Sequence, residues 1–232
     1  MLSYIKHNLN MVLDDISSAE IESSRVPGSV KLLAVSKTFP TEVVLEAYKC
    51  GQRLFGENRI HELEVKVSSL PNDIEWHFIG NLQSNKVNKA VELATCIHSV
   101  DSKKLLKRID RIAEEKGKIP KILLEVNISG EKSKSGLTLD QIEECARTAS
   151  ECKNLEFVGL MTMAPFDADE GVLKKIFGLL RQTRDELKQK LNIALPELSM
   201  GMSSDYRIAI AEGATIVRIG TSIFGKRDYI VR

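Results

Sequence analysis

Short apolar runs alternate along this chain with longer stretches in which apolar residues recur every three or four positions. The short runs are typical of strands buried on both faces, and the longer stretches are typical of amphipathic helices. The pattern predicts strands at Val30–Lys37, Arg53–Glu57, Glu75–Gly80, Thr95–Val100, Lys121–Asn127, Glu156–Met161, Glu197–Met200 and Ala214–Gly220. It also predicts a helix between each pair of consecutive strands and one more at the N-terminus, before the first strand.

Eight strand–helix units in a chain of 232 residues favour a single (β/α)8 TIM-like barrel, an α/β fold, with an extra N-terminal helix. The alternative is an open, doubly wound sheet. No G-x-G-x-x-G motif follows the first strand, and this favours the barrel. Because neither an internal repeat nor a long linker divides the sequence, we expect one domain over residues 1–232.

The charged residues nearly cancel. Lys and Arg total 33 and Asp and Glu total 32, so no overall field draws the protein toward nucleic acid or a membrane surface. No apolar run approaches the ~18 residues of a membrane span. The four scattered cysteines form no C-x-x-C pair, which is typical of a reducing compartment. We therefore expect a cytoplasmic protein, with a weak N-terminal organelle-targeting element as the open alternative.

The first predicted strand ends in Lys37. An ammonium at the end of a buried strand is poorly solvated, and desolvation favours the neutral amine that forms a Schiff base with an aldehyde. The alternative is a strand-end lysine that points into solvent. The loops near the other end of the chain favour the first interpretation.

Loops rich in glycine and hydroxyl residues follow the seventh and eighth strands, at Ser199–Asp205 and Ile219–Gly225. In a (β/α)8 barrel these loops often bind phosphate, and the unpaired N–H groups of a helix N-terminus favour an anion. Ordinary turn and capping chemistry is the alternative for either loop alone. The two loops together predict a phosphate site.

Arg218 lies on the eighth predicted strand, where side-chain alternation places it with Ile216 and Gly220 on the face toward the barrel interior. A buried guanidinium needs an anion or an acceptor nearby. That partner is either Glu57 or Glu125, in a salt bridge, or a ligand atom such as a ring nitrogen. With a Schiff-base lysine and a phosphate site, the ring nitrogen describes a pyridoxal phosphate site.

Two other features carry less weight. The four histidines show no metal-ligand spacing with one another or with the cysteines, so we expect no metal. The stretch Gly130–Gly136, after the fifth strand, is predicted to be a mobile loop. A second interpretation makes Lys132 and Lys134 a basic lip that meets the cofactor phosphate during transfer.

Several runs of the sequence resemble motifs of the pyridoxal phosphate homeostasis proteins. They are Leu33–Lys37, Phe55–Asn58, Trp76–Lys86, Gly159–Pro165, Ser199–Asp205 and Arg218–Thr221. The resemblance extends from about Val30 to the end of the chain. This family is similar to the barrel half of alanine racemases.

The resemblance implies pyridoxal 5'-phosphate as the cofactor, held as an internal aldimine on Lys37, with Arg218 facing the pyridine nitrogen. The implied cofactor-binding residues are Lys37, Asn58, His77, Met202, Ser203, Ser204, Arg218, Gly220 and Thr221. Among them the serines, the glycine and the threonine would hold the phosphate. For His77, a structural role near the core is an equal alternative.

Three functions fit such a site. The first is a protein that buffers the cofactor or delivers it to pyridoxal phosphate-dependent apo-enzymes, without robust turnover. The second is a racemase-like enzyme with weak activity on amino acids, and the third is a lyase or aldolase that forms its Schiff base with a sugar phosphate. Racemases of the related fold take a catalytic tyrosine from a second domain of a dimer, and no tyrosine is expected opposite Lys37 here. We therefore expect a monomeric carrier of the cofactor.

Overall fold

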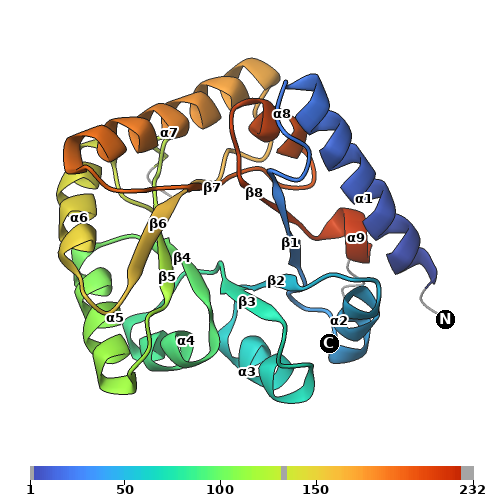
Figure 1. The fold of residues 1–232 in the computed structure, drawn as a ribbon, viewed down its shortest axis with the longest axis horizontal. Coiled ribbons are helices and arrows are strands. Elements are labelled where there is room, and N and C mark those ends of the chain that lie inside the picture. The colour runs from blue at the N-terminus through green and yellow to red at the C-terminus, as the bar shows by residue number, and fades with distance from the viewer. Residues whose placement is uncertain (1–2, 132–134, 226–232) are drawn as a thin grey trace.

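The structure, a computed structural model, describes residues 3–131 and 135–225. Eight parallel strands close a barrel in chain order, and β8 pairs with β1 (Figure 1). The strands are β1 (Lys31–Val35), β2 (Leu54–Glu57), β3 (Glu75–Phe78), β4 (Cys96–Val100), β5 (Lys121–Glu125), β6 (Glu156–Met161), β7 (Glu197–Ser199) and β8 (Ile216–Ile219). The expected (β/α)8 barrel is confirmed, and the open sheet is excluded because Leu33 pairs with Arg218 across the β1–β8 closure.

Helices surround the barrel as an outer ring (Figure 1). They are α1 (Ser3–Glu22), α2 (Thr41–Lys49), α3 (Ile60–Ser69), the 3-10 turn η1 (Ser84–Lys86), α4 (Val87–Leu93), α5 (Lys103–Lys116), α6 (Leu139–Glu151), α7 (Glu170–Leu191), α8 (Tyr206–Ala211) and α9 (Thr221–Phe224). The expected extra helix, α1, lies beside α8 and α9, where Asn8 Nδ2 donates a hydrogen bond to the Ile223 carbonyl at 3.0 Å. None of the helices in these ranges is long and apolar enough to cross a membrane.

Local sequence signals explain where the longer helices begin and end. Ser102 Oγ accepts a hydrogen bond from Leu105 N at the start of α5, and Gly117 ends that helix in the left-handed conformation. Asp169 caps α7 in the same way, through Val172 N at 2.9 Å. These ends fix the lengths of the helices that hold the strands in place.

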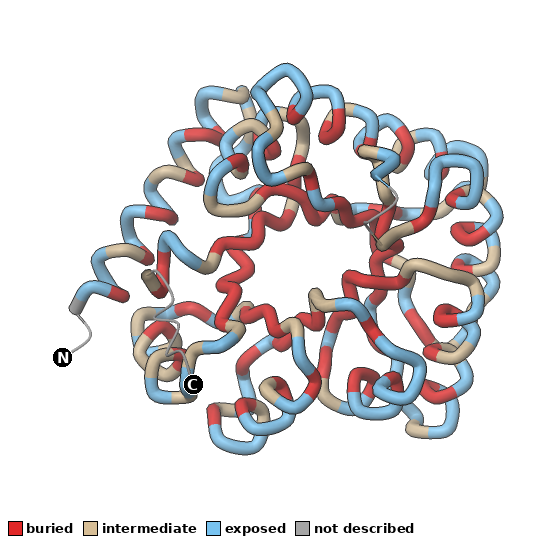
Figure 2. The backbone as a smooth tube through the Cα atoms, turned by 180° about the vertical axis from the view of Figure 1, so that it is seen from behind, coloured by how far each residue is buried: buried red, intermediate tan, exposed pale blue. Residues whose placement is uncertain are grey.

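The hydrophobic core has two parts. The larger part lies between the outer faces of the strands and the helices, and the inner faces of the strands hold a small apolar cluster of Cys96, Leu123, Val158 and Met161. Figure 2 shows the strands as a ring of mostly buried residues. Polar side chains fill much of the remaining interior, among them His77, His98, Ser199 and Arg218, all of them buried. The barrel interior is therefore a packed and partly polar layer beneath the loops.

The main difference from the predicted elements lies after β8. The expected strand Ala214–Gly220 is shorter, at Ile216–Ile219, because Gly220 already serves as the N-cap of α9. Helix α9 was not predicted, since a helix of four residues shows no apolar period. Its first residue is Thr221, which belongs to the predicted phosphate loop.

Candidate cofactor site

A cavity of about 660 Å³ opens where the carboxyl ends of the strands meet. Every strand except β4 contributes a lining residue, either from its own end or from the loop that follows it. The cavity brings together Lys37, Asn58, Met202, Ser203, Ser204, Arg218, Gly220 and Thr221. The chain thus places nearly all of the predicted cofactor-binding residues around one space.

His77 is the exception, because it is not among the residues that line this cavity. It faces the barrel interior from β3, two residues before Ile79, which does line the cavity. Because inward-facing residues of a strand alternate, His77 lies one layer below the pocket. It lines a different cavity, at the amino ends of the strands. The structural alternative stated for His77 therefore fits the geometry better.

A buried ion pair supports the backbone that presents Lys37. Lys66 Nζ lies 2.6 Å from Glu57 Oε1 and donates to the Ser36 carbonyl at 2.8 Å. Ser36 Oγ donates to the same Glu57 oxygen at 2.6 Å. Thr38, the residue after Lys37, has a φ of 70°, which is unusual for a β-branched residue. Lys37 thus lies in a turn two residues after the end of β1, and the Lys66–Glu57 pair holds the preceding residue, Ser36.

Glu57 is consequently not the partner of Arg218. Burial raises the pKa of the Glu57 carboxyl, and the Lys66 ammonium opposes that rise. Glu125, the other proposed partner, lines the cavity and accepts a hydrogen bond from Ser135 Oγ at 2.9 Å. Within residues 3–131 and 135–225, Arg218 forms no ion pair with either carboxylate. The salt-bridge alternative is therefore wrong for the described part of the chain.

Arg218 is instead held by neutral acceptors. Its Nη1 donates to Ser199 Oγ at 2.7 Å and its Nη2 donates to the Thr162 carbonyl at 2.9 Å. Burial lowers the pKa of the guanidinium to about 10, and the nearby carboxylates of Asp205 and Glu125 oppose that shift. The side chain is only 5% exposed yet lines the cavity, so a ligand there meets a fixed cationic donor.

The two hydroxyl-rich loops meet at one side of the cavity. Gly201 turns the first loop with a φ of 91°, where a Cβ atom would meet Ala209 Cβ at 2.6 Å. Asp205 then accepts a hydrogen bond from Met202 N at 2.5 Å, and this leaves Ser203 and Ser204 at the tip of the loop, ahead of α8. On the second loop, Thr221 begins α9, and N–H groups in a first helical turn lack helical acceptors. Both loops thus offer hydroxyl and N–H donors to an anion.

Two observations show that the cavity suits a bound group. Asn58 Oδ1 is buried beside the cavity and has no hydrogen-bond partner within the described residues. Gly220 approaches β1 so closely that a Cβ atom there would lie 3.0 Å from the Val35 carbonyl oxygen. The Asn58 oxygen is available as an acceptor for a ligand donor, and the close approach to Val35 explains why glycine occupies position 220 in the predicted phosphate loop.

Sequence reasoning missed several residues of the cavity. They include Val35, Phe39, Ile79, Gly80, Met163 and Phe166. Phe166 is 88% exposed at the rim, and a single exposed aromatic residue in a loop gives no signal in one sequence. The signal for Gly80 was available, since it lies within the Trp76–Lys86 motif, and a Cβ atom there would meet the Asn58 carbonyl oxygen at 2.1 Å. Lys132 and Lys134 lie outside the described residues.

The spacing argument about metal ligands also missed a contact. Donor atoms of His77, Cys96 and His98 lie within 4.8 Å of one another in the barrel interior. They come from neighbouring strands, so their proximity depends on the register between β3 and β4, which pairs His77 with Cys96. Two of the ring nitrogens already form a hydrogen bond with each other, since His77 Nδ1 lies 2.8 Å from His98 Nε2. Sequence spacing alone cannot show such a cluster.

Sequence comparisons identify the relatives of this chain. Residues 3–228 match the family described as alanine racemase, N-terminal domain. A pyridoxal phosphate homeostasis protein of Aquifex aeolicus is 43% identical over 222 residues, which are 95% of this chain and 97% of that protein. A protein of the same name from Homo sapiens is 46% identical over 213 residues, which are 86% of this chain and 77% of that protein.

A solved structure shows the same relationship in three dimensions. PipY of Synechococcus elongatus, in a structure described as having PLP bound, is 42% identical with a TM-score of 0.82. The match covers 90% of this chain and 100% of that chain. From the family match and these identities, the chain belongs to the alanine racemase N-terminal domain family and, within it, to the pyridoxal phosphate homeostasis proteins.

Proposed function

We propose that this protein binds pyridoxal 5'-phosphate in the cavity at the carboxyl ends of the strands, and buffers or delivers the cofactor. The observation that carries the proposal is the convergence of Lys37, Arg218 and the two hydroxyl-rich loops on one cavity of about 660 Å³. The names of the relatives and the PLP-bound PipY structure support it.

Each group has a distinct role in this proposal. Lys37 Nζ is the amine that bonds to the aldehyde carbon of the cofactor, with loss of water. Ser203, Ser204, Gly220 and Thr221 hold the phosphate, and Arg218 donates a hydrogen bond to the pyridine nitrogen. Asn58 and Met202 line the space between these anchors. When bound, the cofactor supplies an electron sink, whose strength the protein sets through the ring nitrogen.

Two features favour a carrier over an enzyme. Arg218 stays protonated at working pH and donates a hydrogen bond, but it does not readily give up a proton to the ring nitrogen. The ring is then a weak electron sink. A two-base racemase also needs an acid or base on the face opposite the lysine, and no tyrosine among the described residues lines the cavity. Tyr229 lies outside the described residues.

The test is a spectrum of the purified protein with pyridoxal phosphate, followed by borohydride reduction and peptide mapping. Reduction should fix the cofactor on Lys37, and Lys37→Ala should lose the imine absorption while it stays folded. Lys31→Ala is the matched control, because Lys31 begins the same strand at the opposite end of the barrel and pairs with Glu197 at 2.5 Å. A label found mainly on another lysine would sink the assignment.

Delivery and oligomeric state complete the proposal. A buffer protein should release its cofactor to a pyridoxal phosphate-dependent apo-enzyme, and we propose that it does so as a cytoplasmic monomer. Reactivation of an apo-enzyme by the loaded protein, compared with the same amount of free cofactor, measures the transfer. Light scattering after size exclusion measures the mass, and a dimer would contradict the proposed monomer.

A further inference from the structure

A line of four buried polar side chains crosses the barrel interior beneath the cofactor cavity. Arg218 Nη1 donates to Ser199 Oγ at 2.7 Å, and Ser199 Oγ lies 2.9 Å from His98 Nδ1. His98 Nε2 then lies 2.8 Å from His77 Nδ1. The four residues come from β8, β7, β4 and β3, so the line connects opposite sides of the barrel.

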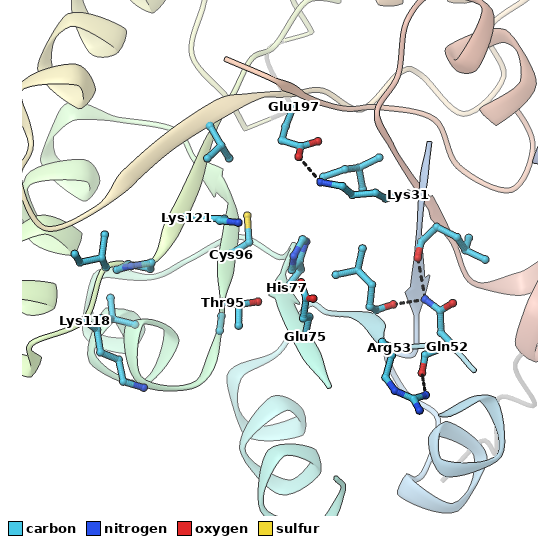
Figure 3. A pocket seen from close by; sticks show the side chains of 18 of the residues that line it. Lys31, Gln52, Arg53, Glu75, His77, Thr95, Cys96, Lys118, Lys121 and Glu197 are labelled. Atoms are coloured by element: carbon cyan, nitrogen blue, oxygen red, sulfur yellow. Dashed lines mark hydrogen bonds and ion pairs between the residues drawn. The ribbon is translucent and has the colours of Figure 1, made fainter. Parts of the chain in front are cut away.

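The far end of this line reaches a second cavity. His77 lines a space of about 940 Å³ at the amino ends of the strands, together with Glu75, Thr95 and Cys96 (Figure 3). His98 occupies Nδ1 of the His77 ring, so Nε2 is the nitrogen left for this cavity. No described side chain forms a hydrogen bond with that Nε2 atom. The line therefore runs from the floor of one cavity to the wall of another.

The protons along the line follow from the partners. Burial lowers the pKa of His77 to about 3 and lowers that of His98 well below its ordinary value, and the cations Lys31 and Lys121 add to the effect on His77. Both rings are thus neutral and carry one N–H each. Because Ser199 Oγ accepts from Arg218, its hydroxyl donates to His98 Nδ1. His98 Nε2–H then donates to His77 Nδ1, and His77 Nε2–H faces the cavity.

The reverse direction is less favourable. If His98 Nδ1–H donated to Ser199, the serine hydroxyl would accept twice, and its own proton would have no acceptor among the described residues. A buried donor without an acceptor is costly. In the favoured direction every acceptor atom faces Arg218, so the aligned dipoles stabilise the guanidinium charge cooperatively. The carboxylates that face Arg218, those of Asp205 and Glu125, act on it only through the longer-range field.

We propose that Ser199, His98 and His77 are positioning residues that hold Arg218 against the pyridine nitrogen of the cofactor. This inference rests on the proposed function. Without the Ser199 bond, the Thr162 carbonyl is the one direct partner of the guanidinium among the described residues, and the guanidinium can turn away from the ring. The ring nitrogen then loses its cationic neighbour and becomes more basic.

The test measures protonation of the ring nitrogen in the loaded protein. Pyridoxal phosphate labelled with ¹⁵N in the ring is bound, and the nitrogen shift is followed against pH. Ser199→Ala should raise the apparent pKa of the ring nitrogen by about one unit, a tenfold gain in proton affinity. Ser199→Thr keeps the hydroxyl and should restore the wild-type titration.

Ser99→Ala is the matched control. Ser99 is a buried serine next to His98 on β4, and its Oγ has no hydrogen-bond partner within the described residues. Removing this hydroxyl should leave the ring titration unchanged. His77→Gln changes the far end of the line, and it should shift the titration in the same direction as Ser199→Ala but by less. It also provides the measurement if Ser199→Ala does not fold.

The outcomes separate this inference from the proposed function. Cofactor attached to Lys37 with the same ring titration in wild type, Ser199→Ala and His77→Gln would overturn the positioning role. An equal shift in the Ser99→Ala control would also overturn it, since the effect would then come from general loosening of the barrel. Failure of the wild-type protein to take up the cofactor at Lys37 would overturn the proposed function itself, and this inference with it.

Discussion

Lys66 Nζ lies 2.6 Å from Glu57 Oε1 in the barrel wall, where the two side chains are 4% and 0% exposed. This pair lies directly beneath the backbone that presents Lys37, because Lys66 also binds the Ser36 carbonyl. A buried ion pair contributes little net stability, but loss of one partner leaves an uncompensated charge. The pair therefore makes the support of Lys37 sensitive to single substitutions.

Lys66→Met should destabilise the protein by roughly 3–5 kcal/mol, because it leaves the Glu57 carboxylate buried without its cation. Denaturant unfolding followed by circular dichroism measures the change. Lys89→Met is the control, since Lys89 forms an exposed pair with Glu64, and such pairs contribute about 0–1 kcal/mol. Equal losses in the two variants would contradict the structural role of the buried pair.

Stability should fall as the pH drops from about 6.5 toward 3. The folded-state pKa of His77 is lowered to about 3, so below the ordinary histidine value the unfolded state binds a proton that the folded state does not. The stability from the neutral imidazole is thus fully present above about pH 6.5 and is lost on acidification. His98 acts in the same direction. Each ring contributes a slope of up to about 1.4 kcal/mol per pH unit.

Unfolding free energies measured across this range test the expected slope. His77→Gln removes one of the two titrating rings and should flatten it. A slope that is identical in His77→Gln and wild type would show that His77 does not carry the depressed pKa in solution.

Thr221→Ala and Ser204→Ala should each weaken retention of pyridoxal phosphate by about tenfold or more, with little effect on folding. A charge-assisted hydrogen bond contributes roughly 1.5–3 kcal/mol, and both hydroxyl residues line the cavity. Equilibrium dialysis of the cofactor measures the change. Ser222→Ala is the matched control, because Ser222 is the next residue on α9, is exposed and does not line the cavity. Unchanged affinity in the Thr221→Ala/Ser204→Ala double variant would place the phosphate elsewhere.

Gly80→Ala should destabilise the protein by roughly 2–3 kcal/mol or more, because the new Cβ atom would lie 2.1 Å from the Asn58 carbonyl oxygen and the backbone must move. Thermal unfolding measures the loss. Gly178→Ala on α7 is the contrasting variant, since its Cβ atom would meet only the end of the Glu212 side chain at 3.2 Å. It should be neutral or stabilising by up to about 1 kcal/mol, because alanine favours a helix interior.

The loaded protein should turn over amino acids slowly. In the proposed binding mode Arg218 leaves the ring a weak electron sink, so racemization, transamination and α-proton exchange of L- and D-alanine should stay below about 1 per second, the lower end of ordinary enzyme rates. Exchange in deuterated water, followed by NMR, measures the most sensitive of these reactions. Turnover above that rate would overturn the carrier proposal in favour of a racemase-like enzyme.

The order and type of the elements could be predicted because each strand is a short buried run and each long helix has its own apolar face. The loops that line the cavity could be predicted because barrel topology brings the carboxyl ends of all strands to one face. The depth at which a side chain lies within the barrel could not be predicted from the sequence. His77 was placed at a strand end, but it lies below the pocket, because its depth depends on strand tilt and register.

The hydrogen-bond partners of Arg218 could not be predicted from the sequence either. Glu57 was a reasonable anionic partner for Arg218 on sequence grounds, but in the fold it pairs with Lys66 from α3 instead. Ser199, a small neutral side chain, carries no sequence signal that distinguishes a guanidinium acceptor from an ordinary buried serine. Buried polar pairings between distant strands depend on geometry that one sequence does not encode locally.

The closure of the barrel between β1 and β8 has a consequence for synthesis. Lys37 follows the first strand made and Arg218 lies on the last, and the two strands meet only at this seam, where Leu33 pairs with Arg218. A nascent chain in which β8 has not yet been synthesised has no complete pocket. A ligand bound to residues of both strands stabilises the closed barrel against separation of β1 and β8. It raises the free energy of unfolding by about 2.7 kcal/mol when its concentration is a hundred times its Kd.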